Sequence, residues 1–197
     1  MANPLQRFFA ATVSCATETA ATLAGRGSLA AANDARESNT WLKRRITRNL
    51  SVKAPKSSRV RWQSGLKFKV QVRNHAFLVD EPTHLTGEDT SPNSMEYVLG
   101  AYGACLATGF VLNATKRGIH IANMEVSVES TQDNSFKFLG INDEGHPGFD
   151  FVTAKLYVQA DADERTIKEL WERTLDSSPV ANSLSREVRL KSEVQVF

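Results

Sequence analysis

Cysteine is scarce in this chain, because Cys15 and Cys105 are the only two among 197 residues. Two cysteines are too few for the disulfide framework of a small secreted domain, and their spacing matches no zinc-binding pattern. The four histidines are scattered without the spacing of metal ligands. We therefore expect no metal and no cofactor, and we expect a reducing compartment, the cytoplasm, as the location.

Long apolar runs and strong net charge are also lacking. The longest largely apolar run, residues 98–112, falls short of the ~20 residues that a membrane span needs, and it contains three glycines. The formal net charge is only +2, so we expect no nucleic-acid and no membrane partner. Residues 1–25 are poor in acids and resemble an organelle transit segment, which would change the location to an organelle matrix.

One segment departs from the balanced charge of the whole chain. Residues 43–69 contain ten Lys or Arg and no Asp or Glu. A solvated basic face is the plainest interpretation, because the segment lacks an aromatic series for base stacking. An electrostatic anchor to nucleic acid or anionic lipid is the alternative, and its binding would weaken as salt is added.

The residue pattern divides the chain into an extension and one domain. Residues 1–58 predict an N-terminal extension, with an amphipathic helix followed by an irregular basic segment. Residues 59–197 predict a single domain that mixes helices with antiparallel strands, an α+β fold.

Alternating apolar and polar residues predict the strands of this domain. Residues 66–73 alternate in this way, and Asn74-His75 suits a tight turn into a second strand, which predicts a hairpin. Residues 124–129 and 152–159 alternate as well and predict two further strands. Residues 188–196 predict a final strand at the end of the chain.

Capping signals predict the helices. Asn93 and Glu96 have the spacing of a capping box, and Gly118 suits the end of the long helix that they begin. Asp161 and Glu164 have the same spacing ahead of a second helix, whose apolar residues share one face.

Cys105 lies in the middle of the predicted long helix among small and apolar residues. It is either a small packing residue or a shielded redox centre. It lies too far from the helix N-terminus to be activated by the helix dipole, so a reactive thiol here needs a nearby Arg or His. Glu96 is nine residues away, which places it on the opposite face of the helix, and we interpret it as a cap.

Two other positions could belong to such a centre. Ser178-Pro179 predicts the start of a short helix, with Ser178 as the N-cap and proline at the first helical position. Arg73 falls at the polar face of a predicted strand, where a solvated side chain is the default interpretation.

These residues together resemble the OsmC/Ohr superfamily, the osmotically inducible protein C and organic hydroperoxide resistance proteins. The resemblance covers about residues 59–197, and three segments carry it in this order: residues 72–82, VRNHAFLVDEP, residues 90–106, TSPNSMEYVLGAYGACL, and residues 178–182, SPVAN. It implies an intertwined α+β homodimer, in which two long central helices are packed with antiparallel sheets and the sites lie at the subunit interface.

The resemblance also implies a chemistry. In active members a first cysteine attacks an organic hydroperoxide, and a second cysteine captures the sulfenic acid that forms. Cys105 matches the first cysteine, and Ser178 stands where the second would fall. Arg73 is the nearest candidate for the arginine that holds the thiolate. The glutamate that orients this arginine would align at Met95, one residue before Glu96, which leaves Glu96 as a structural or supporting residue.

Three functions follow as alternatives. The first is a one-cysteine, thiol-dependent hydroperoxide reductase, in which an external thiol or Cys15 reduces the sulfenic acid of Cys105. The second is a module without catalysis that binds a small apolar ligand in the dimer cleft, so enzymatic activity stays an open question at this point. The third is the electrostatic anchor of residues 43–69.

Overall fold

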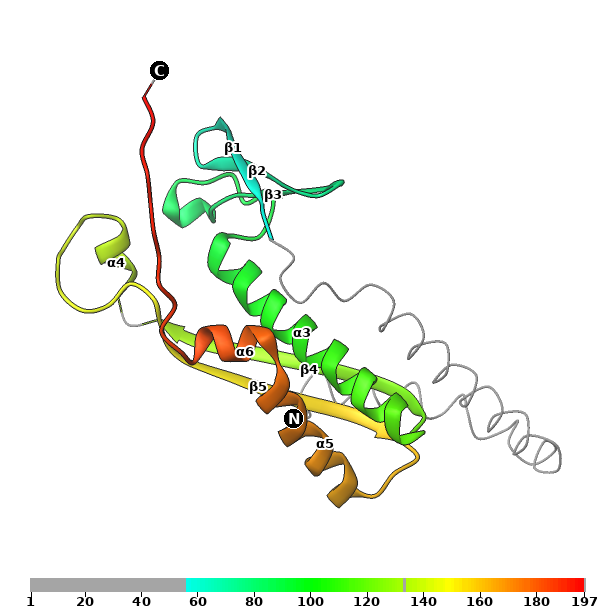
Figure 1. Cartoon of the computed structure of the whole chain (residues 1–197). Coiled ribbons are helices and arrows are strands. Elements are labelled where there is room, and N and C mark those ends of the chain that lie inside the picture. Colours follow the sequence, from blue (N-terminus) through cyan, green and yellow to red (C-terminus); the bar gives the residue numbers. More distant parts are fainter. Residues whose placement is uncertain (1–55, 133, 197) are drawn as a thin grey trace. The chain divides into compact units, whose positions relative to one another are not determined.

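A computed structural model describes residues 56–132 and 134–196 of the chain (Figure 1). The helix predicted within residues 1–58, residues 43–55 of the basic segment and Cys15 lie outside the described residues. The described part combines two antiparallel sheets with helices, which confirms the predicted α+β class.

The first sheet has three antiparallel strands in the order β1 (Arg59–Ser64), β2 (Lys67–Val72) and β3 (His75–Val79). The predicted β2–β3 hairpin is confirmed, but its turn lies one residue earlier than expected. Val72 pairs with His75, so Arg73 and Asn74 form the turn and Arg73 has a φ of 55°. The alternating pattern wrongly includes Arg73 in the strand, because alternation cannot show where the ladder of backbone hydrogen bonds stops.

Strand β1 was not among the predicted strands. Its cations lie on the same face of the sheet as those of β2, since Arg61 lies directly opposite Lys69. Like charges at such paired positions are mildly destabilising. Lys67 lies opposite Ser64 and forms a 2.6 Å ion pair with Glu88.

A buried carboxylate organises the loop between β3 and the long helix. Asp80 is 1% exposed, and its two oxygens accept hydrogen bonds from the backbone amides of Glu81, Glu88 and Thr90 and from the Thr90 hydroxyl. The Thr90 hydroxyl is the main reason that the pKa of Asp80 falls from 3.8 to about 2. The same loop contains a short 3-10 helix, Thr83–Leu85.

The long helix α3 (Ser94–Arg117) begins and ends where the sequence predicts. The Asn93 side chain accepts from the Glu96 amide at 2.9 Å, and the Glu96 carboxylate accepts from the Asn93 amide at 2.8 Å, which is the predicted capping box. Gly118 ends the helix with a φ of 73°. By length and composition α3 could cross a membrane, but in the described structure it packs against β4, α5 and α6.

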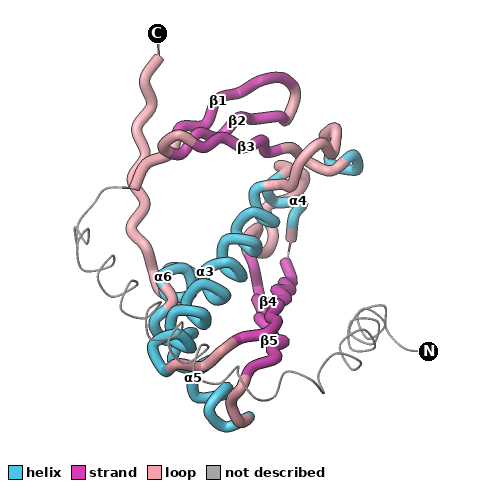
Figure 2. The backbone as a smooth tube through the Cα atoms, turned by 90° about the vertical axis from the view of Figure 1, so that its right-hand side faces the viewer, coloured by secondary structure: helices cyan, strands magenta, loops and turns pink. Residues whose placement is uncertain are grey.

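The second sheet pairs two long antiparallel strands, β4 (Ile121–Gln132) and β5 (Phe149–Ala160), as the alternation predicts. A short helix, α4 (Ser135–Phe138), lies in the connection between them. Figure 2 shows α3 running along this sheet, with α5 (Glu164–Ser177) and α6 (Pro179–Leu184) beside it.

The core lies where α3, α5 and the second sheet meet. Phe110, Ala114 and Leu170 are fully buried, and the rings of Phe110 and Trp171 meet edge to face with centroids 6.4 Å apart. Partly buried apolar residues surround them: Ile119, Ile121, Met124, Leu156, Val158 and Ile167. Burial of one such large side chain stabilises the fold by about 1.5–3 kcal/mol.

Two predictions at the end of the chain are wrong. The cap of α5 is Asp163, which accepts a hydrogen bond from the Thr166 amide. Asp161 instead accepts from the His120 amide, beside the paired strands β4 and β5. Residues 187–196 form no strand in the described chain, because no neighbouring strand pairs with them.

Candidate functional site

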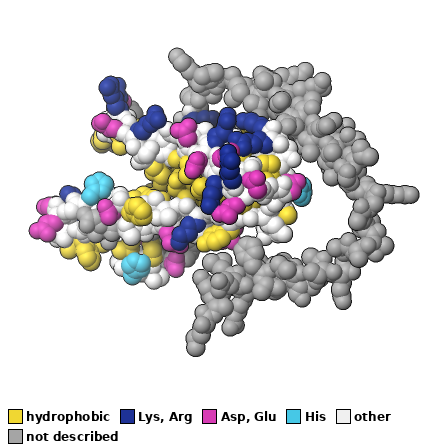
Figure 3. Space-filling view, turned by 90° about the horizontal axis from the view of Figure 1, so that it is seen from below, with side chains coloured by type: hydrophobic (Ala, Val, Ile, Leu, Met, Phe, Trp, Pro, Cys, Tyr) yellow, Lys and Arg dark blue, Asp and Glu magenta, His cyan; other side chains and the backbone are white. Residues whose placement is uncertain are grey.

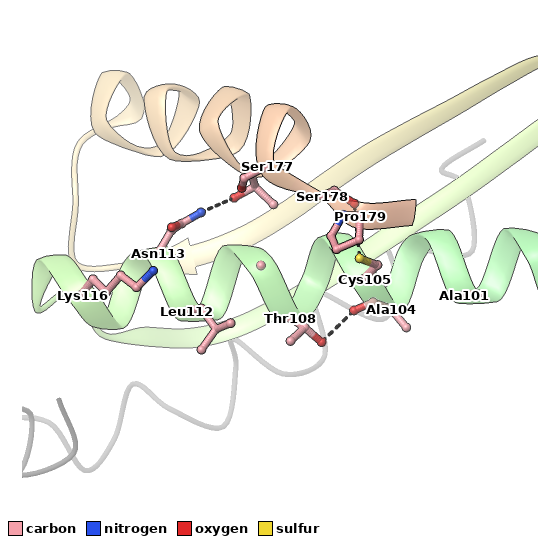
Figure 4. Close-up of a pocket in the computed structure, with 12 residues that line it drawn as sticks. Ala101, Ala104, Cys105, Thr108, Leu112, Asn113, Lys116, Ser177, Ser178 and Pro179 are labelled. Carbon is pink, nitrogen blue, oxygen red and sulfur yellow. Dashed lines mark hydrogen bonds between the residues drawn. The ribbon is translucent and has the colours of Figure 1, made fainter. Parts of the chain in front are cut away.

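A groove runs along α3 where this helix faces the α5–α6 junction (Figure 4). Its volume is about 540 Å³. The lining side chains are mostly small, apolar or hydroxyl-bearing: Ala101, Ala104, Cys105, Thr108, Gly109, Leu112, Asn113, Lys116, Thr174, Ser177, Ser178 and Pro179. Cys105 therefore opens to a groove and is not a fully enclosed packing residue.

Cys105 and Ser178 meet in this groove. The Cys105 sulfur lies 3.3 Å from the Ser178 hydroxyl oxygen, within hydrogen-bonding distance. Cys105 is half-buried and carries a free thiol, whereas Ser178 is only 4% exposed. The two positions that the family resemblance pairs are thus adjacent in the folded chain, although they lie 73 residues apart in sequence.

Hydrogen bonds to both α5 and α6 hold Ser178 at the junction of these two helices. Its amide donates to Leu175 at the end of α5, and its hydroxyl accepts from the Ala181 amide at the start of α6 at 3.2 Å. Pro179 occupies the first helical position, so the predicted serine cap is confirmed. The Asn182 side chain further closes the junction by donating to the carbonyl oxygens of Asp176 and Ser178.

The direction of the hydrogen bonds matters for the chemistry of Cys105. The Ser178 oxygen accepts from Ala181 and keeps one proton and a second lone pair, so either the hydroxyl or the thiol can donate between Ser178 and Cys105. A hydroxyl at this place can hydrogen-bond a thiol, a thiolate or a sulfenic acid, but it cannot form a disulfide with any of them.

A second polar contact closes the far wall of the groove. The buried Asn113 side chain donates to the Thr174 hydroxyl at 3.1 Å, and this hydroxyl donates to the Leu170 carbonyl oxygen at 2.7 Å. Close approach of α3 to α5 depends on Gly109, since a Cβ atom there would lie 3.0 Å from the Thr174 methyl group. Neither Asn113 nor Thr174 was a candidate from the sequence, because only the folded chain brings them together.

The other predicted site residues lie outside this groove. Arg73 is exposed in the β2–β3 turn, and Glu96 serves the capping box of α3. Of the described residues that line the groove, Lys116 is the one charged residue. Its spacing of eleven residues from Cys105, about three helical turns, was the sequence signal that could have found it.

Comparisons with solved structures identify the same fold. An OsmC-like protein from Mycoplasma pneumoniae has 15% identity and a TM-score of 0.58, with 67% of this chain and 88% of that chain covered. An OsmC-like protein of unknown function from Vibrio cholerae has 12% identity and a TM-score of 0.57, with 68% and 96% covered. The organic hydroperoxide resistance protein OsmC from Legionella pneumophila has 14% identity and a TM-score of 0.52, with 67% and 90% covered. At such identities the likeness shows a shared fold.

A comparison with curated protein sequences finds no match. The family model described as OsmC-like protein, however, matches residues 87–193, which include the whole of α3 and the Ser178 junction. Because this match spans more than half of the chain, the protein belongs to the OsmC-like protein family.

Proposed function

We propose that the protein reduces organic hydroperoxides through a single cysteine, Cys105, and that an external thiol completes the cycle. The observation that carries this proposal is the position of the Cys105 sulfur, which opens to the groove and lies 3.3 Å from the Ser178 hydroxyl. A cysteine whose only role is packing is usually enclosed by other side chains, whereas Cys105 lines an open groove. Membership of a redox protein family, the OsmC/Ohr-like proteins, adds support.

The proposed reaction has two stages. In the first, the Cys105 thiolate attacks the terminal oxygen of the hydroperoxide, the O–O bond breaks, and the products are an alcohol and the Cys105 sulfenic acid. In the second, a thiol condenses with the sulfenic acid and releases water, which leaves a mixed disulfide on Cys105. A second thiol attacks this disulfide and restores the Cys105 thiol. Because Ser178 has no thiol, both thiols that reduce Cys105 come from outside the Cys105–Ser178 pair.

A homodimer is part of the proposal. Val188, Leu190, Val194 and Val196 alternate with charged or polar residues and are 56–91% exposed in the single chain. Figure 3 also shows apolar side chains lying open among the charged ones. Pairing of this tail with a sheet edge of a second copy would satisfy its backbone and cover its apolar side chains.

The dimer also bears on Arg73. This side chain does not line the groove of its own chain, so a direct role at Cys105 would require Arg73 from a second copy. We propose that the second copy supplies it. In that case Arg73→Met should slow the oxidation of Cys105, whereas the neighbouring Asn74→Ala should leave it unchanged.

Sedimentation of the purified chain tests the dimer. The double variant Leu190→Ser with Val194→Ser removes two of the four apolar side chains of the tail, and Arg189→Ser with Glu193→Ser removes two side chains from the other side. We expect the wild type and the second double variant to sediment as dimers and the first to dissociate. A wild type that sediments as a monomer contradicts the dimer.

Consumption of cumene hydroperoxide in the presence of dithiothreitol tests the catalytic proposal. We expect the wild type to consume the hydroperoxide catalytically and Cys105→Ser to consume none. Cys15→Ala separates the two reduction routes, because it should be fully active if the external thiol reduces Cys105 directly. A wild type that shows no thiol-dependent consumption refutes the catalytic proposal.

The lining of the groove also favours a second candidate, a module that binds a small apolar ligand without catalysis. Among the described residues that line it there is neither Arg nor His to hold a thiolate. This candidate predicts that Cys105 reacts with iodoacetamide no faster than cysteine in an unfolded control. Faster labelling of the folded protein would argue against it.

A further inference from the structure

Positive and negative charges are divided unevenly along the chain. Residues 56–79, which include the three strands of the first sheet, contain six Lys or Arg and no Asp or Glu. Residues 80–197 contain ten Lys or Arg and nineteen Asp or Glu. The small net charge, from which we expected no nucleic-acid partner, is thus an average over two regions of opposite charge.

The strand register gathers cations on one face of the first sheet, whose strands are labelled in Figure 1. Arg61 of β1 lies opposite Lys69 of β2, and Arg59 lies opposite Gln71. Because successive side chains of a strand alternate between its two faces, these four residues share one face, which we call the basic face. All four are exposed, and none of the ion pairs between described residues includes Arg59, Arg61 or Lys69.

The stability of the sheet does not explain the basic face. Like charges at directly opposed positions of paired strands are destabilising, as at Arg61 and Lys69. Cations on an edge strand can prevent unwanted pairing with other chains, which would account for the arginines of β1. It does not account for Lys69, because β2 is the central strand of the sheet. Such a departure from local stability is expected where a function requires it.

The residues around these cations indicate which polyanion the basic face fits. The aromatic side chains of the strands lie on the opposite face, because Trp62 pairs with Phe68, and Phe77 pairs with Val70 on β2. Single-stranded nucleic acids are held by stacking on aromatic side chains, and peripheral binding to a bilayer buries apolar side chains in it. The basic face offers neither an aromatic ring nor an apolar cluster, since Leu78, opposite Lys69, is its one large apolar residue.

We propose that the basic face binds the phosphate backbone of double-stranded DNA, independently of sequence. Arginine presents forked donors that match phosphate oxygens, and Lys69 adds a compact charge. Because β1 is an edge strand, β1 and β2 can approach the duplex as a two-stranded ribbon, which the major groove of B-DNA admits. The narrow major groove of duplex RNA does not. This site does not involve Cys105 or the groove beside it.

A titration of labelled duplex DNA with the full chain tests the proposal, with fluorescence anisotropy as the readout over a range of NaCl concentrations. Each cation that contacts a phosphate releases close to one counterion, so three unpaired cations predict that log K falls against log salt with a slope of about −3 or steeper. Duplex binding that is absent or insensitive to salt overturns the proposal.

A double variant tests whether the basic face is the site. Arg61→Gln with Lys69→Gln should make the salt slope shallower by about 2 and weaken binding about fifty-fold at about 0.1 M salt. Arg186→Gln with Arg189→Gln removes the same charge from exposed residues outside the sheet and should change neither value. Equal effects of the two double variants would mean that overall charge, and not the basic face, governs binding, which also overturns the proposal.

Urea unfolding separates binding from folding. The variant Arg61→Gln with Lys69→Gln loses a pair of opposed like charges and should be at least as stable as the wild type. Lower stability would assign these charges to the fold and count against a binding role. Arg59→Gln provides a second test, because Arg59 faces the neutral Gln71, and it should make the salt slope shallower by about 1.

The competing polyanions are measured under the same conditions. They are single-stranded DNA of the same sequence, duplex RNA, and vesicles of phosphatidylserine with phosphatidylcholine. Each is expected to bind more weakly than duplex DNA, and tighter binding of any of them refutes the assignment to DNA. Cys105→Ser should bind DNA as the wild type does, so a failure of hydroperoxide reduction leaves this proposal intact.

Discussion

A cysteine at position 178 should complete a disulfide with Cys105. The Cys105 sulfur lies 3.3 Å from the Ser178 oxygen in the native chain. A disulfide requires two sulfur atoms about 2.05 Å apart, so the gap to close is roughly 1 Å, and the longer Cβ–Sγ bond of Ser178→Cys takes up part of it. Oxidation of Cys105 by one equivalent of hydroperoxide should give a sulfenic acid, which the introduced thiol attacks with release of water.

The magnitude follows from the length of the closed loop and from the cap that is lost. Cys105 and Ser178 are 73 residues apart, and closing a loop of this length lowers the entropy of the unfolded chain enough to stabilise the fold by about 4 kcal/mol. Loss of the Ser178 cap on the Ala181 amide costs about 1 kcal/mol. Relative to the wild type, the reduced variant should therefore be about 1 kcal/mol less stable and the oxidised variant about 3 kcal/mol more stable.

Urea unfolding with and without reductant measures both values, and intact-mass analysis shows whether the two thiols have joined. The experiment uses a Cys15→Ala background, so that Cys105 has one candidate partner. Ser183→Cys is the control, because Ser183 is exposed and its hydroxyl donates to the Pro179 carbonyl. If Ser178→Cys forms no disulfide after exposure to hydroperoxide, as Ser183→Cys should form none, the arrangement of α3 and α6 described above is wrong.

Three further predictions concern the framework of the site. Asp80→Asn removes a carboxylate whose pKa is lowered to about 2, so the variant should be less stable than the wild type above pH 3.8. This difference in stability should shrink as the pH falls from 3.8 toward 2, and urea unfolding at pH 7 and pH 3 measures it. Gly109→Ala places a Cβ atom 3.0 Å from the Thr174 methyl group and should destabilise the fold by about 1–3 kcal/mol. Gly100→Ala has open space around the new Cβ atom and should stabilise the helix by up to about 1 kcal/mol. Equal shifts of the melting temperature of the two variants in thermal unfolding would contradict this. Thr174→Val leaves the buried Asn113 amide without its acceptor and should cost about 1–3 kcal/mol in urea unfolding, and a neutral result would mean that the Asn113 contact contributes nothing.

Much of the local structure could be predicted because its causes lie within a few residues of one another. The capping box of Asn93 and Glu96 and the left-handed Gly118 define α3 from both ends, and each needs only its own neighbours. Ser178 and Pro179 begin α6 for the same reason. Where a prediction failed, the missing information was pairing: the Arg73 turn depends on which residues of β2 and β3 face each other.

The sequence by itself determined the α+β class, the long helix that carries Cys105, the serine cap at position 178 and, through three short segments, the family. These depend on residue identity and local spacing. Only the tertiary structure decided that the Cys105 sulfur and the Ser178 hydroxyl oxygen lie 3.3 Å apart, that Asn113 hydrogen-bonds Thr174, and that Lys116 lines the same groove. Contacts between residues distant in sequence follow from how α3 packs on α5 and α6, and no local pattern records that packing.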